Sequence, residues 1–473
     1  MFAWNALFAP VLSAASAAAP AASTPGRPVL PMVVIGAILV ATFAAIAFEV
    51  YHKSLAALLG AIVAVVAALS LGVYHAAPGE RAYNAVHNFI AHDLGVIGVI
   101  VGTSILVEIA GGSGLFHFIA VRLVKLTRGR PSVLLPAIMA ATIGFVTFLT
   151  IAPGVLIMSS LVLVITKALE DRPTPYIMAV AIGANSGALM TFASGIPTLM
   201  IGTAARIPYV HFLAVSTPLA LLSAMIAFAV IRFAYRRDLV VTGDPVAREA
   251  KVAAFDEWAL VKDRSIFYRC AAILGLTIIG FAFAQQLGVG LDFIALTGGT
   301  LALLFSGFNV EDAIRKVKWP IILFFVGLFI LIGTVQETGL LNVLANQITA
   351  IAGDSMFLAL LIIIPFVFIT AGIVDNIPVA ATMIPIVRNM IDAGFAPEPL
   401  WWSLIAACNL GGNPTPVGSI AAVIALHALA HERGIRIGWG EYLKVGGLIT
   451  LLQIPLVIIY MEFYRRLGLF PEL

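Results

Sequence analysis

Residues 409–419 read Asn409-Leu-Gly-Gly-Asn413-Pro414-Thr415-Pro416-Val-Gly418-Ser419. Two prolines and three glycines within these eleven residues cannot hold a regular helix. The flanking residues 401–408 and 420–428 are nevertheless apolar. We interpret residues 401–428 as two half-helices joined by non-helical backbone, because such backbone is tolerated at membrane depth where it lines a cavity. A simple loop between helices is the alternative, but it would be expected to carry charge, and this stretch carries none.

An earlier stretch repeats this pattern at an offset of 224 residues. In Asn185-Ser-Gly187-Ala-Leu-Met-Thr191 the three numbered residues have the spacing of Asn409, Gly411 and Thr415. At nearly the same offset, Gly114-Leu115 corresponds to Gly339-Leu340, and Pro153 corresponds to Pro378. So many landmarks at one offset indicate an internal repeat. We assign residues 92–237 to the first copy of the repeat and residues 317–466 to the second copy.

The composition indicates a membrane protein. Of the 473 residues 61% are hydrophobic and 11% are charged, whereas a soluble domain carries about 25% charged residues. Continuous apolar stretches argue for helices and against a β-barrel, and each is long enough to cross a hydrocarbon core of about 30 Å. We therefore predict an all-α polytopic protein of the inner membrane. The candidate spans are 29–50, 55–74, 93–110, 131–148, 154–168, 176–201, 212–233, 266–284, 293–308, 321–336, 356–373, 378–390, 401–428 and 442–460.

Basic residues predict the orientation of the two copies. The third span is followed by Arg122, Lys125, Arg128 and Arg130, but the corresponding residues 340–355 of the second copy contain no basic residue. Because basic loops remain in the cytoplasm, equivalent loops lie on opposite sides and the repeats have inverted topology. The chain paths close if residues 131–168 and 356–390 form re-entrant helical hairpins. Arg465 and Arg466 then lie outside, against the rule.

The same rule predicts a cytoplasmic position for three further groups of charges, which are the central segment, the run Arg315, Lys316 and Lys318, and the pair Arg433 and Arg436. The central segment, residues 238–264, mixes acids with bases, so we interpret it as a solvated linker and not as a nucleic-acid-binding segment. We expect residues 1–28 to be a disordered or interfacial N-terminal segment rather than a cleaved signal. Residues 29–75 are expected to form two leading transmembrane helices and residues 265–308 two connecting helices.

The second hairpin carries the clearest candidate for a coupling group. Its tip reads Thr370-Ala-Gly-Ile-Val-Asp375-Asn376-Ile-Pro378. A carboxylate deep in an apolar segment is unfavourable unless it is paired, protonated or solvated, and Pro378 leaves a backbone carbonyl free about one turn earlier. Asp375, Asn376 and such carbonyls suit a hard cation or a proton. Asp375 is also expected to cap the helix that starts there, and the two roles are compatible.

Both broken spans supply glycines and uncharged polar groups, and the half-helix after each break points its N–H groups at a ligand. We predict ion or substrate binding by Asn185, Gly187, Thr191, Ser194, Gly195, Pro197 and Thr198 in copy one and by Asn409, Gly411, Gly412, Asn413, Thr415, Gly418 and Ser419 in copy two. The helices are expected to be broken by Pro153, Pro378, Pro414 and Pro416. At the first hairpin tip Thr150 takes the place of the acid–amide pair, so the site carries one strong carboxylate.

These residues resemble the ion transporter superfamily, in the branch of arsenite efflux permeases, NhaD-type sodium/proton antiporters and the melanosomal P protein, with a citrate-transporter-like domain. The resemblance covers roughly residues 30–465 and rests on the Asp375–Pro378 tip, on residues 409–419 and on the ending at residues 431–446. It implies secondary transport, with substrate and coupling cation held between the hairpin tips, and a homodimer. Many members of this branch have an Asp-Asn pair at the first hairpin, where this chain has Thr150.

Three classes of function fit a polytopic chain. The repeat, the broken spans and the single carboxylate favour an ion-coupled secondary active transporter of a small inorganic or organic ion, driven by H⁺ or Na⁺ and working by alternating access. A sodium/proton antiporter without an anion substrate stays open. An enzyme would need a nucleophile–base pair or a metal-ligand cluster at membrane depth, and we find none. A channel would need a continuous polar pore, and two pseudo-symmetric ligand clusters fit alternating access better. We expect no cofactor and no resident metal, with Na⁺ bound only as cargo. The expected partners are membrane lipid and a small ion, without nucleic acid or an ATPase.

Overall fold

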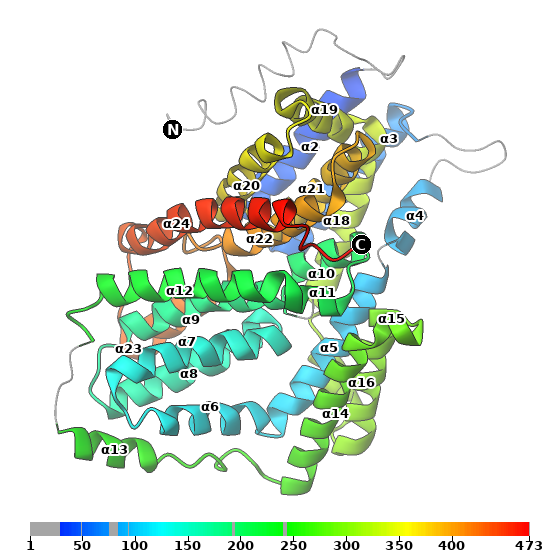
Figure 1. The fold of residues 1–473 in the computed structure, drawn as a ribbon. Helices are drawn as coiled ribbons and strands as arrows, with labels where there is room; N and C mark the ends of the chain where they lie inside the picture. Colours follow the sequence, from blue (N-terminus) through cyan, green and yellow to red (C-terminus); the bar gives the residue numbers. More distant parts are fainter. Residues whose placement is uncertain are drawn as a thin grey trace. The chain divides into compact units, whose positions relative to one another are not determined.

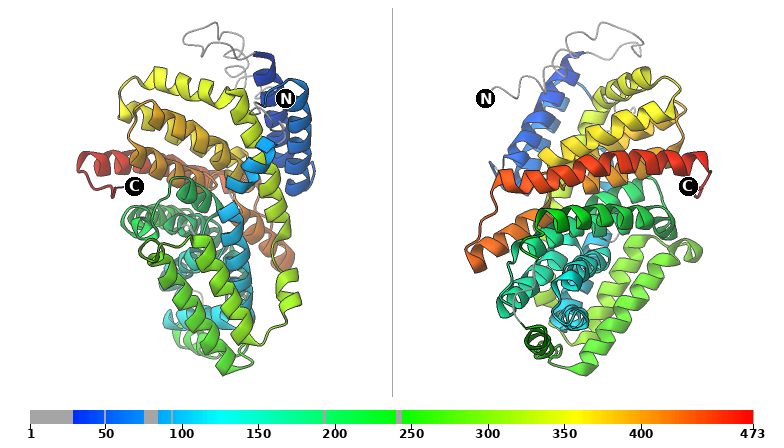
Figure 2. Two further views of the ribbon diagram at one scale, coloured as in Figure 1. Left: turned by 90° about the vertical axis from the view of Figure 1, so that its right-hand side faces the viewer. Right: turned by 60° about the vertical axis from the view of Figure 1, so that its left-hand side comes forward.

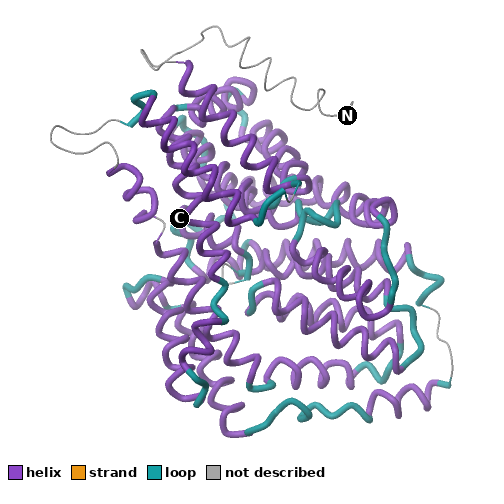
Figure 3. Tube along the Cα trace, turned by 180° about the vertical axis from the view of Figure 1, so that it is seen from behind, coloured by secondary structure: helices purple, strands orange, loops and turns teal. Residues whose placement is uncertain are grey.

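The computed structural model describes residues 29–48, 50–74, 84–92, 94–191, 194–239 and 244–472. The N-terminal segment 1–28, which we expected to be disordered or interfacial, lies outside these residues. Within the described ranges all regular elements are helices and no strand occurs (Figure 3). Ten of the helices there are long and apolar enough to cross a membrane. The predicted class, an all-α multi-pass membrane protein, is therefore confirmed.

The chain divides into two compact units, and the first comprises residues 1–91 and 323–344. Its helices are α2 (Val29–Ala47), α3 (Lys53–Ser70), α4 (Asn84–His92), most of α18 (Trp319–Thr338) and the start of α19 (Leu340–Ala352). Helices α2 and α3 pack on each other. The hydroxyls of Tyr74 and Thr334 lie 2.7 Å apart and join the two segments of this unit.

The second unit comprises residues 92–322 and 345–473. Its helices, which Figure 1 colours along the chain, are α5 (Leu94–Gly112), α6 (Leu115–Leu126), α7 (Pro131–Phe148), α8 (Ile151–Ala168), α9 (Thr174–Met190), α10 (Ile196–Ala204), α11 (Tyr209–Ala214), α12 (Ser216–Ala234), α13 (Pro245–Ala253), α14 (Arg264–Ala282), α15 (Ala284–Leu287), α16 (Leu291–Ser306), α17 (Val310–Arg315), α20 (Met356–Ile373), α21 (Asn376–Asp392), α22 (Pro397–Leu410), α23 (Ile420–Arg433) and α24 (Trp439–Arg466). Both expected broken spans are present, as α9 and α10 and as α22 and α23.

Helix boundaries recur along the two copies. Helices α7 and α20 begin at residues 131 and 356, and α8 and α21 begin at residues 151 and 376, so that both pairs lie 225 positions apart. Helices α10 and α23 begin 224 positions apart, at residues 196 and 420. The turns before α6 and α19 each use a glycine with positive φ, 85° at Gly114 and 81° at Gly339, a conformation that other residues rarely adopt. The local structure therefore repeats at the offset seen in the sequence.

Within the second unit the two copies also exchange helices, in the sense that a helix of each copy packs against helices of the other. Helix α10 packs against α21 and α22 of the other copy, and α23 packs against α8 and α9. Helices α9 and α22 contact each other, as do α12 and α24, which run side by side in the right-hand view of Figure 2. When the copies are interchanged, the contacts of α10 map onto those of α23 and the other two pairs map onto themselves, as expected for two repeats related by a pseudo-two-fold axis. This exchange brings the two broken spans together.

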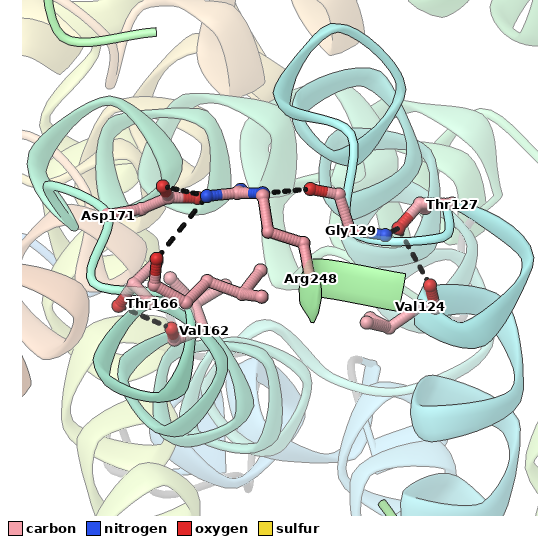
Figure 4. A network of polar contacts seen from close by, with 8 residues as sticks. Val124, Thr127, Gly129, Val162, Thr166, Asp171 and Arg248 are labelled. Carbon is pink, nitrogen blue, oxygen red and sulfur yellow. Dashed lines mark hydrogen bonds and ion pairs between the residues drawn. The ribbon is translucent and has the colours of Figure 1, made fainter. Parts of the chain in front are cut away.

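The central linker, which we expected to be a solvated tether, is exposed along most of its described residues, but it is fastened to the rest of the unit at Arg248. On α13 the side chain of Arg248 is buried, and its guanidinium pairs with both carboxylate oxygens of Asp171, at 2.8 and 2.7 Å (Figure 4). It also donates to the carbonyl oxygen of Gly129 at 3.0 Å. We call this arrangement the Arg248 clasp. It fastens the linker to the loops after α6 and α8, and the sequence did not reveal it because Arg248 lies among exposed charges.

Replacing Arg248 by alanine is expected to destabilise the protein by about 3–5 kcal/mol, because the Asp171 carboxylate is then left buried without the guanidinium. Thermal unfolding in detergent measures this as a lowered midpoint. Lys251→Ala is the matched control, since Lys251 lies on the same helix as Arg248 and its ion pair with Glu170 is exposed. Such an exposed pair is worth less than about 1 kcal/mol. Equal small effects for the two variants would contradict a structural role of the clasp.

Candidate functional site

The tips of the two hairpins have the same backbone conformation. Thr150 and Asp375 are the N-cap residues of α8 and α21, with φ and ψ of −67° and 153° in the first and −61° and 142° in the second. The residue before each cap, Leu149 or Val374, ends the preceding helix through its N–H, with N–O distances of 2.7 and 2.8 Å. The structure thus places Thr150 at the position equivalent to Asp375.

Asp375 lies at the second tip and is 8% exposed. Its Oδ1 accepts a hydrogen bond from the N–H of Ile377 at 3.3 Å, so the capping role that we expected is present. Asn376, the next residue, is also buried. A carboxylate can accept several hydrogen bonds, so that capping by one oxygen is compatible with binding a cation or a proton.

A threonine in each broken span ties that span to the hairpin of its own copy. Thr191 Oγ1 donates to the carbonyl oxygen of Thr147 at 2.8 Å, and Thr415 Oγ1 donates to that of Gly372 at 2.5 Å. We call these two contacts the threonine latches. Each acceptor lies in the last turn before a hairpin tip. Thr191 and Thr415, which we predicted as ligands, therefore also position the tips.

Buried hydrogen bonds between side chains connect the two broken spans. Asn185 Nδ2 donates to Asn413 Oδ1 at 2.8 Å, and Asn185 Oδ1 accepts from Ser419 Oγ at 2.7 Å. Asn413 Nδ2 then donates to Gln453 Oε1 at 2.9 Å, and Gln453 Nε2 donates to Ser223 Oγ at 2.6 Å. All five side chains are buried. Because a fully paired buried network fixes one arrangement, these contacts hold the two copies in register.

Two members of this network were missed by the sequence analysis. Gln453 is the only amide in the apolar segment 442–460, a signal that could have identified it. Ser223 offered no signal, because serine in a membrane helix commonly bonds to the backbone of its own helix. Predicted residues from both copies, Asn185, Asn413 and Ser419, are brought into direct contact.

Asn409 is the counterpart of Asn185 but its pairing differs. Its Nδ2 donates to Thr198 Oγ1 at 2.8 Å and to the carbonyl oxygen of Ile405 at 2.7 Å. Since that carbonyl can only accept, the orientation of the amide is fixed. Asn409 Oδ1 is then buried and, within the described part of the chain, has no hydrogen-bond partner. Such an oxygen costs about 1–3 kcal/mol and would be satisfied by a cation or by a ligand donor.

Gly195 leaves the space beside this oxygen. It is the N-cap residue of α10, and a Cβ at this position would lie 2.8 Å from Asn409 Oδ1 and 2.8 Å from the carbonyl oxygen of Ala188. That carbonyl accepts from Ser194 and Thr198 at 3.0 and 2.8 Å. The N-terminus of α10 thus begins beside an unpaired acceptor, with hydroxyl groups close by.

Other predicted positions serve the backbone. Gly187 allows close packing, since a Cβ there would lie 2.7 Å from the carbonyl oxygen of Ile143. Close approaches also occur at Gly411, Gly412 and Gly418. Pro153 and Pro378 lie in the first turn of α8 and α21, where the missing N–H has no partner within the helix. They start helices rather than break them, whereas Pro414 and Pro416 lie in the break itself.

Replacing Gly195 by alanine is expected to reduce transport by roughly tenfold or more, because the new methyl group contacts Asn409 Oδ1 and pushes the start of α10 away. The initial rate of uptake or exchange in proteoliposomes measures it. Gly144→Ala in α7 is the control, since a Cβ there meets no atom within 4 Å. An unchanged rate in Gly195→Ala would show that this space is not used.

A lysine that the charge pattern assigned to a cytoplasmic loop reaches the first hairpin tip. Lys318 Nζ donates to Thr150 Oγ1 at 2.9 Å. Burial lowers the pKa of Lys318 to about 8 and the Glu108 carboxylate on α5 opposes this shift, so that the ammonium predominates at neutral pH. Lys316 pairs with Glu108 at 2.7 Å. No pattern in the sequence indicates this contact, because Lys318 belongs to a run of basic residues.

Comparison with known proteins gives a consistent set of similarities. The sequence matches a family described as Citrate transporter over residues 43–407. It is similar to an uncharacterized transporter of Mycobacterium tuberculosis, with 29% identity over 442 residues that cover 91% of this chain and 97% of the relative. It is also similar to the arsenical pump membrane protein of Escherichia coli, with 23% identity over 429 residues that cover 89% and 96%.

Among solved structures the fold is similar to that of the Alcanivorax borkumensis YdaH transporter. The TM-score is 0.60 at 15% identity, and the match covers 89% of this chain and 100% of that one. At this level of identity the likeness concerns the fold alone.

Proposed function

Because this chain belongs to the citrate transporter family, we propose that it is a secondary active transporter of a small ion, coupled to H⁺ or Na⁺ and working by alternating access. The observation that carries the proposal is the meeting of two broken helices, one from each copy, around buried and uncharged polar groups. Asp375 at the second hairpin tip is the proposed coupling group. A proton or Na⁺ neutralises this carboxylate while the site is closed to water.

The substrate is proposed to bind between the hairpin tips, beside the start of α10. Asn409 Oδ1 offers an acceptor there, and the N-terminus of α10, which has no side-chain cap, offers backbone donors. This combination suits a small solute that has both hydroxyl donors and oxygen acceptors. Arsenite and the carboxylic acids are such solutes, and we include citrate and arsenical compounds among the candidates because the family and the Escherichia coli relative are named for them.

A sodium/proton antiporter without an anion substrate is the alternative. The feature that favours it is the single carboxylate, since the position equivalent to Asp375 in the first copy holds Thr150 and not a second acid. In that case Na⁺ and H⁺ would compete for Asp375. The homodimer implied by the resemblance stays a prediction for both cases.

The test is transport by the purified full-length chain in proteoliposomes with an imposed pH or Na⁺ gradient and a pH dye inside. The solutes are Na⁺, Li⁺, arsenite, sulfate, citrate and C4-dicarboxylates. Gradient-driven movement of one anion or neutral solute supports the proposed permease. Cation-evoked proton movement without uptake of any other solute supports the antiporter. Downhill flux that neither gradient can drive uphill contradicts both.

A further inference from the structure

The two hairpin tips match in backbone and differ in charge. Asp375 and Thr150 hold the same N-cap position, so a cation bound at the second tip has its symmetry-equivalent position beside Thr150. At that position the structure contains the ammonium group of Lys318, 2.9 Å from Thr150 Oγ1. Thr150 makes no capping hydrogen bond with its side chain, so that its hydroxyl oxygen is turned to the lysine rather than to the helix.

We infer that the Lys318 ammonium is a tethered cation that occupies the first hairpin tip in place of a mobile one, so that this transporter binds a single coupling cation, at Asp375. The inference rests on the proposed function for the meaning of Asp375. It gives Lys318 the role of a residue that determines cation stoichiometry.

The charges around Lys318 support a permanent place for its ammonium group. Glu108 on α5 is the carboxylate that acts on it, and on its own segment Arg315 and Lys316 are the neighbouring cations. Lys316, which is more exposed than Lys318, pairs with the Glu108 carboxylate at 2.7 Å. The ammonium is a compact point charge with three donors, so that it can bind the Thr150 hydroxyl oxygen in the way that a metal ion would.

The same charge would exclude a second mobile cation. Two unit charges about 4 Å apart at an effective dielectric constant of about 20 repel strongly enough to weaken binding by roughly a thousandfold. A cation beside Thr150 would be that close to Lys318, because both would contact the same hydroxyl oxygen. Removing the lysine should therefore reopen this position, provided that the tip also supplies a carboxylate.

The experiment counts Na⁺ bound per purified protein by equilibrium dialysis with radioactive Na⁺. The double variant Thr150→Asp with Lys318→Gln gives the first tip the charge of the second, and is expected to bind one more Na⁺ than the wild type. Thr150→Asp alone is the matched control, because Lys318 then pairs with the new carboxylate and no additional Na⁺ is expected. An additional Na⁺ in the single variant, or none in a double variant that elutes as a folded protein, would overturn the inference.

Uptake in proteoliposomes gives a second readout should the double variant not fold. Lys318→Arg is expected to retain transport, whereas Lys318→Gln is expected to lose roughly tenfold, since the first tip then holds no cation and Thr150 supplies no carboxylate to bind one from solution. Lys316→Gln should behave as the wild type. Equal rates for all three variants would overturn the inference. Failure of the wild type to couple transport to any cation would instead contradict the proposed function, and the dialysis result would still decide the role of Lys318.

Discussion

Asp375→Asn is expected to lower coupled transport by roughly 100-fold or more, equivalent to about 2.7 kcal/mol, and to leave the fold intact. Asparagine is as good an N-cap as aspartate, so it can replace the oxygen that accepts from Ile377 at the start of α21. It cannot carry a negative charge or exchange a proton. This substitution therefore separates the capping role from the proposed coupling role, because only the proposed role needs the carboxylate.

The measurement is gradient-driven transport in proteoliposomes, with thermal unfolding in detergent as the check on folding. Asp392→Asn at the other end of α21 is the control, since Asp392 is exposed. If Asp375→Asn transports at the normal rate with unchanged dependence on pH and Na⁺, Asp375 is a cap and nothing more.

The double variant Asn185→Ala with Asn409→Ala is expected to lower the affinity for the transported ion by roughly 100-fold, through two distinct causes. Asn185→Ala leaves Asn413 Oδ1 and the Ser419 hydroxyl without their partner, so it loosens the contact between the copies. Asn409→Ala removes the acceptor Oδ1 that has no partner within the described residues, so it weakens ligand binding with less effect on stability.

The single variants distinguish these causes. Titration of uptake rate against substrate gives the affinity, and the unfolding midpoint gives the stability. Asn185→Ala should lower the midpoint more than Asn409→Ala does, and Asn409→Ala should weaken binding more than Asn185→Ala does. Asn346→Ala on the exposed side of α19 serves as the control. Full affinity in the double variant would mean that the two copies do not form a shared site.

Much of this architecture could be predicted because membrane helices and their interruptions leave strong local signals. The prolines and glycines of residues 409–419 located the break between α22 and α23. The recurring Asn, Gly and Thr located its counterpart between α9 and α10. Continuous apolar stretches predicted helices, since lipid leaves the backbone no other partner than itself.

The remaining features depend on contacts between distant segments, which spacing along a sequence cannot reveal. Lys318 contacts Thr150 across 168 positions, and Arg248 contacts Asp171 across 77. Both were grouped with exposed charges, because a basic residue in a polar segment gives no sign of what it contacts. The positions of Pro153 and Pro378 were interpreted as breaks for a different reason. Proline is found both where a helix is interrupted and in the first turn of a helix, and the sequence does not distinguish the two cases.

The boundaries that we predicted for the repeats, residues 92–237 and 317–466, follow the symmetry of the sequence. The compact units follow packing instead, since residues 323–344 are grouped with α2, α3 and α4 while the rest of the second copy lies in the other unit. A repeat in sequence is therefore not an independent body here. The exchange by which α10 and α23 each pack against helices of the other copy leads to the same conclusion.

That exchange has a consequence for how the chain is made. Helix α10 ends at residue 204, but α21 and α22, against which it packs, begin at residues 376 and 397. At about 5–20 residues per second, synthesis of the intervening chain takes roughly 10–40 seconds. During that time the first broken span has been released from the ribosome without the surface that completes it, and its polar break must be kept from lipid by other means. The nascent chain therefore depends on the insertion machinery for longer than its hydrophobicity alone would require.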